Sequence, residues 1–224
     1  MLHKKQLAAM IEGTEVSQVT TESDVRHLIK LANEYRFACV GIVQCFHALA
    51  KELLAQAGNN DTVIVGCCGY PLGSDSTTVK LMQIRDSLAT GCKEMDLTNN
   101  LSWVKSGMYA EMEEELKRLV DACEGIPTKV IIEITKLSDD ETKRVCEACV
   151  RAGATYIKTG TGTGLPTTPE HIRLIKSIVG DDAKIKASGG IRDIHIIEEM
   201  VGLGANRFGV GQSHIPSILD SCPD

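Results

Sequence analysis

Short apolar runs alternate with longer amphipathic segments along this chain, and that alternation limits the possible folds more than any other feature. Apolar runs bounded by turn residues are typical of buried strands, and the amphipathic segments between them are typical of helices. The predicted strands cover residues 7–11, 37–43, 61–65, 93–98, 129–134, 154–158, 183–187 and 206–210. The predicted helices cover residues 21–34, 45–57, 75–89, 109–124 and 138–152, and one more follows each of the strands at 154–158 and 183–187.

Eight strands that repeat at a spacing of roughly 20–35 residues predict a closed parallel barrel inside a ring of helices, the (β/α)8 or TIM barrel of the α/β class. The length of 224 residues fits one such domain, and no linker or low-complexity stretch interrupts the series. Residues 1–224 are therefore predicted to form a single domain. An open doubly wound sheet is the alternative, but eight regular units favour closure.

Composition excludes several classes of partner. The net charge is −6 and no run is rich in lysine or arginine, so neither nucleic acid nor an anionic membrane surface is a predicted partner. The apolar runs are too short to span a bilayer, and residues 1–6 lack the apolar segment of a signal peptide. The nine cysteines are an odd number scattered through apolar segments. They predict reduced thiols and a cytoplasmic location.

Two consecutive predicted strands carry a lysine near their ends. Lys158 is followed by a glycine-rich turn, and Lys186 precedes Ser188 and two glycines. Burial disfavours the ammonium form, and two ammonium groups repel each other, so we expect each lysine to lower the pKa of the other. A neutral amine attacks carbonyl groups and can form a Schiff base. The pair therefore predicts imine chemistry on a carbonyl substrate.

Two carboxylates also lie near strand ends. Catalytic groups of a barrel lie at the carboxyl ends of its strands, where we expect Asp96 and Glu133 to join the lysines, with residues 98–100 nearby. A carboxylate and a second amine can move protons while the first amine reacts. The alternatives remain that Asp96 caps a turn or pairs with a lysine, and that Glu133 forms a plain salt bridge with a lysine.

Glycine-rich turns follow three of the predicted strands. Backbone N–H groups in such turns can point at an anion, and the helix that opens near Thr168 offers a positive amino end. The glycines concerned are Gly160, Gly162, Gly164, Gly189, Gly190, Gly209 and Gly211. Barrels often bind phosphate on the loops of their last two strands, so these turns predict a phosphate site. The alternative is that the glycines only close short turns.

Metal and redox chemistry have little support. Four histidines lie on predicted helices without the spacing of metal ligands, so neither a metal nor another cofactor is predicted. Cys146 and Cys149 have redox-motif spacing but fall inside a predicted amphipathic helix, which predicts packing. Cys67 and Cys68 are adjacent within a strand and cannot readily form an unstrained disulfide.

The chain resembles the deoxyribose-phosphate aldolases, a class I aldolase family, from Ile11 to Gly211. The segments that carry the resemblance are 69–73 (GYPLG), 94–97 (EMDL), 105–107 (KSG), 129–133 (KVIIE), 150–159 (VRAGATYIKT), 186–192 (KASGGIR) and 204–207 (GANR). The resemblance implies a (β/α)8 barrel, a Schiff base on Lys158, a helper lysine at Lys186 and a proton-shuttling Asp96. It also implies a homodimer and a reaction without a metal.

The chain departs from the family pattern around the substrate. The family's first-strand Asp-His-Thr is replaced by residues 12–14, EGT, which keep a carboxylate on a longer arm. Its second-strand Cys-Val-Asn-Pro is replaced by residues 41–44, GIVQ, which lose the cysteine and the asparagine. Its Thr-Ser-Thr-Gly and its final phosphate loop become residues 159–163, TGTGT, and 209–213, GVGQS. The catalytic trio is intact, whereas the substrate-holding residues differ.

We therefore predict a class I aldolase that reversibly cleaves 2-deoxy-D-ribose 5-phosphate to acetaldehyde and D-glyceraldehyde 3-phosphate. Lys158, Lys186 and Asp96 are its predicted catalytic residues, supported by Glu12 and Glu133. The residues predicted to hold the substrate or its phosphate are Thr159, Gly160, Gly162, Gly189, Gly190, Gly209, Gly211 and Ser213.

Three alternatives remain open. The same fold could act on another sugar phosphate or an unphosphorylated aldol. It could bind phosphate without turnover, or be a decarboxylase or isomerase that uses the lysines electrostatically. The predicted partners are a small aldehyde or sugar phosphate and a second copy of the chain.

Overall fold

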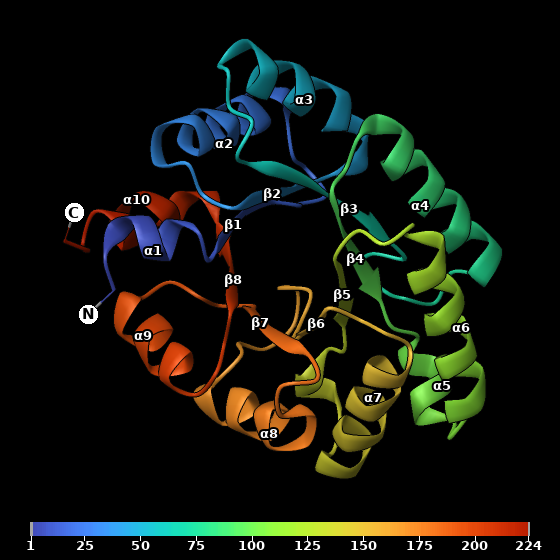
Figure 1. Ribbon diagram of the computed structural model, residues 1–224. Coiled ribbons are helices and arrows are strands. Elements are labelled where there is room, and N and C mark those ends of the chain that lie inside the picture. Colours follow the sequence, from blue (N-terminus) through green and yellow to red (C-terminus); the bar gives the residue numbers. More distant parts are fainter. Residues whose placement is uncertain (1, 224) are drawn as a thin grey trace.

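A computed structural model describes residues 2–223 and shows eight parallel strands closed into a barrel with helices around it (Figure 1). The strands are β1 Ile11–Glu15, β2 Cys39–Ile42, β3 Val63–Cys68, β4 Glu94–Thr98, β5 Thr128–Ile131, β6 Tyr156–Lys158, β7 Lys184–Ser188 and β8 Arg207–Gly211. Each strand pairs with the next in sequence, and β8 closes the ring against β1. The predicted (β/α)8 barrel is confirmed. Met1 and Asp224, the ends of the predicted domain, lie outside the described residues.

Amphipathic segments supply the outer ring. The helices are α1 Lys4–Ala8, α2 Glu22–Tyr35, α3 His47–Gln56, α4 Thr77–Thr90, α5 Leu101–Lys105, α6 Tyr109–Ala122, α7 Asp139–Arg151, α8 Pro169–Val179, α9 Ile194–Gly202 and α10 Ile215–Leu219. Several begin at side-chain caps, such as Thr21 before α2 and Ser138 before α7. Three short 3-10 turns complete the set: η1 Gln44–Phe46, η2 Ile134–Lys136 and η3 Gln212–His214.

The predicted strand at residues 7–11 is wrong. Leu7 belongs to α1, and the strand begins only at Ile11. Leu7 is fully buried as part of a helix, and its apolar neighbours resemble a strand in sequence. The real strand includes Glu12, a charge that ordinarily argues against a buried strand. Glu12 is tolerated because the barrel interior supplies lysine partners for it.

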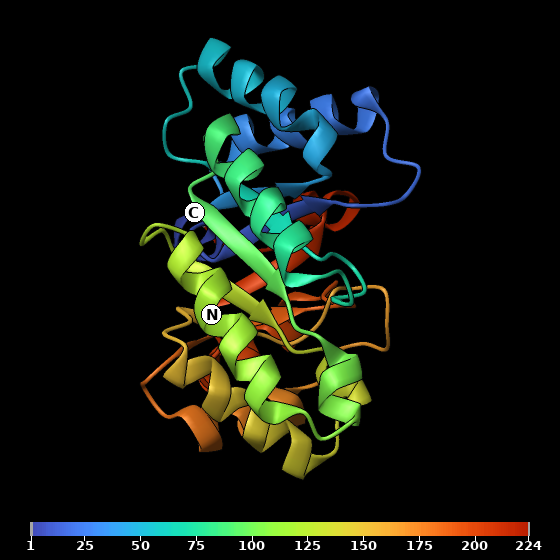
Figure 2. The same ribbon diagram turned by 90° about the vertical axis from the view of Figure 1, so that its right-hand side faces the viewer.

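The main apolar core lies between the strands and the helices, as in other barrels. Figure 2 shows two of these helices, α4 and α6, side by side on one flank of the barrel.

The two ends of the described chain meet, because the Lys4 N–H donates a hydrogen bond to the Pro223 carbonyl at 2.8 Å. Within residues 2–223, no helix combines the length and the apolar character needed to cross a membrane.

Candidate active site

The two predicted lysines and the predicted aspartate meet inside the barrel. Lys158 on β6 and Lys186 on β7 are register partners, and Asp96 projects toward both from β4. The Lys158 Nζ lies 2.5 Å from Asp96 Oδ2, and the Lys186 Nζ lies 3.4 Å from the same oxygen. One carboxylate oxygen therefore contacts both amines.

The charges of the two lysines differ from the sequence-based expectation. Burial disfavours the ammonium form of Lys158, but Asp96 and Glu12 outweigh burial and raise the pKa of Lys158 above its usual value. For Lys186, burial dominates; Asp96 and Glu12 oppose it, Lys158 and Lys129 reinforce it, and the pKa falls to about 8. Lys158 lowers the pKa of Lys186 as expected, but the carboxylates keep the pKa of Lys158 high, so the expected lowering of the Lys158 pKa is not found. Lys186 is the amine that gives up its proton more readily.

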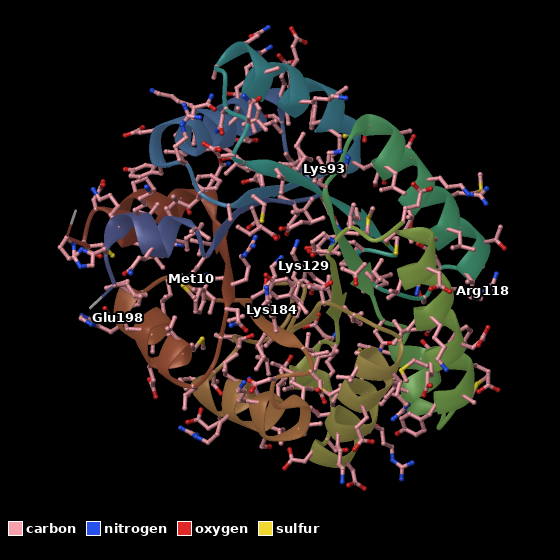
Figure 3. All side chains as sticks on the ribbon, in the orientation of Figure 1. Met10, Lys93, Arg118, Lys129, Lys184 and Glu198 are labelled. Carbon is pink, nitrogen blue, oxygen red and sulfur yellow. The ribbon has the colours of Figure 1, made fainter. Side chains whose placement is uncertain are left out.

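A third buried lysine, which the sequence analysis did not select, lies in the same interior. Figure 3 shows Lys129, from β5, within the ring of strands. Glu12 on β1 joins it to the site: one Glu12 oxygen contacts Lys186, and the other lies 3.2 Å from the Lys129 Nζ. Burial alone would raise the pKa of Glu12, but the lysines lower it well below its usual value. Glu12 thus lies within the predicted site, as an ionised bridge between two lysines.

The charged interior continues toward the amino ends of the strands. Glu94 on β4 lies 2.5 Å from the Lys129 Nζ and 3.5 Å from the Arg207 guanidinium. The Cys39 thiol donates a hydrogen bond to Glu12 at 3.4 Å. Glu12, Cys39 and Glu94 bring possible metal-ligand atoms within 4.8 Å of one another. Their carboxylates are already paired with Lys129 and other cations, so this group is an ion-pair network by its chemistry.

A cavity of about 530 Å³ opens at the carboxyl ends of the strands. Lys158 and Asp96 lie in its wall, as does Glu12, while the fully buried Lys186 lies behind them. The other predicted residues that line it are Gly162, Gly189, Gly190, Gly209, Gly211 and Ser213. The predicted catalytic and phosphate-binding residues therefore largely share one cavity.

Thr159 and Gly160 do not line that cavity. The Thr159 hydroxyl turns between the strands, where it donates to the Ser188 carbonyl at 3.0 Å and contacts the Thr167 hydroxyl at 2.7 Å. Gly160 lies against Glu133, whose Oε1 would be 3.1 Å from an added Cβ. Both residues shape the turn behind the wall, which corrects their predicted contact with the substrate.

Glu133 has a different partner from the one expected. Its Oε2 accepts hydrogen bonds from the Thr161 backbone N–H at 3.0 Å and from the Thr161 hydroxyl at 2.6 Å. Within the described residues it forms no salt bridge with a lysine. The reason is its backbone, which turns to a left-handed φ of 51° two residues after the end of β5. Glu133 therefore supports the loop that follows Lys158.

Tyr70 is a cavity residue that sequence reasoning missed. Its hydroxyl donates to the Thr161 carbonyl at 3.0 Å, which joins the loop after β3 to the loop after β6. Gln83, on α4, holds the base of the same loop by accepting from the Gly69 N–H at 2.7 Å. The motif GYPLG was visible in the sequence, but nothing in it indicated which loop its aromatic ring would meet.

The glycine turns line the same cavity as Tyr70. Gly189 and Gly190 have left-handed φ values of 103° and 73°, which a side chain would strain. Consecutive residues in such conformations can expose backbone N–H groups to an anion. Arg192 and Ser213 line the cavity with them. The helix after Thr168, by contrast, contributes no residue to the lining.

Curated proteins similar to this chain are deoxyribose-phosphate aldolases. The one from Klebsiella pneumoniae is 34% identical over 95% of this chain and 86% of its own length. The one from Coprothermobacter proteolyticus is 38% identical over 91% of this chain and 92% of its own length. No protein-family model matches the chain.

Solved structures agree with these relatives. The aldolase QR15 has a TM-score of 0.89 at 32% identity, covering 99% of this chain and 96% of that one. A deoxyribose phosphate aldolase from Aeropyrum pernix, described as a unique tetramer, has a TM-score of 0.88 at 28% identity, covering 97% and 91%. With the shared barrel, the strand-end lysines and the curated relatives together, the chain belongs to the deoxyribose-phosphate aldolase family.

Proposed function

We propose that this protein cleaves 2-deoxy-D-ribose 5-phosphate reversibly to acetaldehyde and D-glyceraldehyde 3-phosphate through an imine on Lys158. The observation that carries the proposal is the contact of Lys158 and Lys186 with a single oxygen of Asp96 at the cavity wall. That arrangement links a cavity-facing amine to a proton acceptor through one carboxylate. The family membership of the chain supports the named substrate.

Imine formation begins with proton transfer away from Lys158. Its ammonium is paired with Asp96 at rest, so the proton can move to the Asp96 carboxylate and on to neutral Lys186, 3.4 Å from the same oxygen. The neutral Lys158 amine then adds to the C1 aldehyde of the open-chain sugar. Protonation of the carbinolamine hydroxyl by the same groups releases water and leaves the iminium ion.

Carbon–carbon cleavage follows from the charge on the iminium nitrogen. Loss of the C3 hydroxyl proton to the site, through a water molecule or Asp96, lets the C2–C3 bond break, and its electron pair enters the iminium system. D-Glyceraldehyde 3-phosphate leaves, and the enamine remains on Lys158. Protonation at C2 and hydrolysis then release acetaldehyde and restore the amine.

The glycine-rich end of the cavity is the proposed phosphate site. Gly189 and Gly190 offer their backbone, while Ser213 and Arg192 supply a hydroxyl and a cation to the same lining. The other glycines proposed for this end are Gly162, Gly209 and Gly211. Lys158 lines the same cavity, so one bound molecule could contact both these residues and the Lys158 amine.

The test is borohydride trapping with deoxyribose 5-phosphate, followed by peptide mass spectrometry. We expect a reduced two-carbon adduct on Lys158, and no turnover or adduct in Lys158→Met. Lys184→Met is the matched control, because Lys184 is an exposed lysine at the start of β7. It should retain both turnover and adduct, with a folded barrel in all three proteins.

The other outcomes separate the parts of the proposal. An adduct with acetaldehyde but not with deoxyribose 5-phosphate would keep the imine mechanism and discard the named substrate. No adduct with either compound, or full activity in Lys158→Met, would discard the mechanism.

We also propose a cytoplasmic location and a homodimer. All nine cysteines are free thiols, which supports a reducing compartment. The tetramer belongs to the Aeropyrum pernix relative, and sedimentation of this protein tests the dimer.

A further inference from the structure

We propose that Lys129 is a positioning residue for the reaction on Lys158, and that it acts through Glu12 and Lys186. The inference rests on the function proposed above and adds a residue outside the cavity lining. Lys129 is fully buried, and the family resemblance assigns it no role. Its effect would reach the substrate only through the side chains between them.

Glu12 is the connection. Its two carboxylate oxygens are divided between two amines, one toward Lys186 and one 3.2 Å from the Lys129 Nζ. The Lys129 Nζ has further carboxylates near it, Glu94 at 2.5 Å and Asp96 at 3.6 Å. Every carboxylate that contacts Lys186 is therefore shared with another lysine.

The interior holds more cations than carboxylates. Lys129, Lys158, Lys186 and Arg207 face only Glu12, Glu94 and Asp96 in these ion pairs. An uncompensated charge is costly in a low-dielectric interior, so the network favours the loss of one proton. Arginine does not lose its proton in proteins. Lys186 shares both of its carboxylates, Glu12 with Lys129 and Asp96 with Lys158, and the repulsion of those two lysines adds to burial in lowering its pKa, so Lys186 is the amine that becomes neutral.

The groups that face Lys186 come from several strands. The contributing strands and groups are Glu12 from β1, Asp96 from β4, Lys129 from β5 and Lys158 from β6. Farther groups of the network are Cys39 from β2, Cys67 from β3, Glu94 from β4 and Arg207 from β8. Of these groups, Lys129 is the one cation that competes directly with Lys186 for Glu12.

Removal of the Lys129 charge should therefore raise the pKa of Lys186. Glu12 would then belong to Lys186 alone, and one repulsive charge would be gone. In the proposed mechanism neutral Lys186 receives the proton that leaves Lys158. The acidic limb of the pH profile of kcat/KM should consequently move to higher pH.

The experiment compares the wild type with Lys129→Met and Lys129→Arg across pH 6–10, with deoxyribose 5-phosphate as substrate. We expect the wild-type acidic limb to have its midpoint at about 8, the pKa of Lys186. In Lys129→Met the midpoint should rise by about one pH unit, with about a tenfold loss of kcat/KM at pH 7 and recovery above the new midpoint. Lys129→Arg, which keeps the charge, should retain the wild-type midpoint more closely.

Two further variants guard against loss of folding. Lys129→Met with Glu94→Gln removes one cation together with one carboxylate, which restores the excess of one cation, so its upward shift should be smaller than that of Lys129→Met alone. Lys80→Met removes an equally buried lysine outside this network, so its midpoint should stay at the wild-type value. A purely structural role for Lys129 would lower kcat/KM equally at every pH.

A second readout does not need turnover. The Lys186 side chain can be titrated by NMR of isotope-labelled lysine, with its signal assigned by comparison with Lys186→Met. If an adduct forms on Lys158 but the Lys186 midpoint is the same with and without Lys129, the inference is wrong and the proposed function stands. If the wild type forms no adduct with either compound, the proposed function fails and takes with it any role of Lys129 in the reaction.

Discussion

Two sites in this protein bury lysines completely, and their charge balance differs. Between the barrel and its helices, the Lys80 Nζ lies 2.7 Å from Glu115 Oε2 and donates to the Thr98 carbonyl at 3.0 Å. One cation meets one carboxylate there, on the flank where α4 and α6 pack together (Figure 2). Inside the barrel, three lysines and Arg207 share three carboxylates, so the cations outnumber the carboxylates. The site at Lys80, with balanced charges, joins α4 to α6. The site inside the barrel, with one cation in excess, can release a proton.

Loss of the balanced pair should have the largest effect on stability. Lys80→Met leaves the Glu115 carboxylate buried without its cation, which should lower the free energy of unfolding by about 3–5 kcal/mol. Denaturant unfolding measures the loss. Lys80→Met with Glu115→Leu should recover much of it, because no charge is then left unpaired. A single variant as stable as the wild type would show that the pair contributes nothing.

The unbalanced site should show itself in the pH dependence of stability. Unfolded Lys186 keeps its proton up to its ordinary pKa of 10.5, whereas folded Lys186 releases it at about 8. Between these pH values the unfolded chain binds more protons, so a rise in pH favours the folded state through this group. Relative to Lys186→Met, the wild type should gain stability from pH 8 to pH 10, by up to about 3 kcal/mol.

Unfolding at several pH values, for both proteins, isolates the Lys186 contribution from that of the other lysines. A constant or shrinking difference over the same range would mean that Lys186 titrates as an ordinary lysine.

An exposed ion pair gives the smallest expected effect and calibrates the other two. Arg151 on α7 donates to Glu113 on α6 at 2.8 Å, and its side chain is 53% exposed. Arg151→Gln should cost about 0.2–1 kcal/mol of unfolding free energy, because water solvates both partners once they separate. Thermal unfolding in low and high salt measures the loss and its screening. A loss as large as that of Lys80→Met would end the distinction between buried and exposed pairs.

The sequence was sufficient for the fold and for much of the site. Alternation of apolar runs and amphipathic helices fixes strand order, and parallel closure brings the strand ends of Lys158, Lys186 and Asp96 together. Lys129 was missed because it lies near the start of its strand, where a lysine ordinarily reaches solvent. Only the closed ring places Glu12 of β1 where it can bind that lysine.

Local conformation explains the remaining errors. Glu133 was expected to meet a lysine, but a left-handed backbone turns it toward the loop at Thr161. Thr159 follows the reactive lysine directly, yet its hydroxyl turns inward to the Ser188 carbonyl. Neither the backbone handedness of one residue nor the rotation of one hydroxyl leaves a periodic pattern in the sequence. Such details depend on neighbouring strands.

Gly41 has a consequence for how this sequence can diverge. A Cβ added at Gly41 would lie 3.1 Å from Glu12 Oε1, so the longer acid occupies space that a side chain at position 41 would need. The family pattern combines a first-strand aspartate with a second-strand cysteine at these places, and this chain combines glutamate with glycine. The two positions should therefore exchange together during evolution, with the combination of glutamate at position 12 and a side chain at position 41 selected against. An alignment of close relatives would show this as a correlated pair.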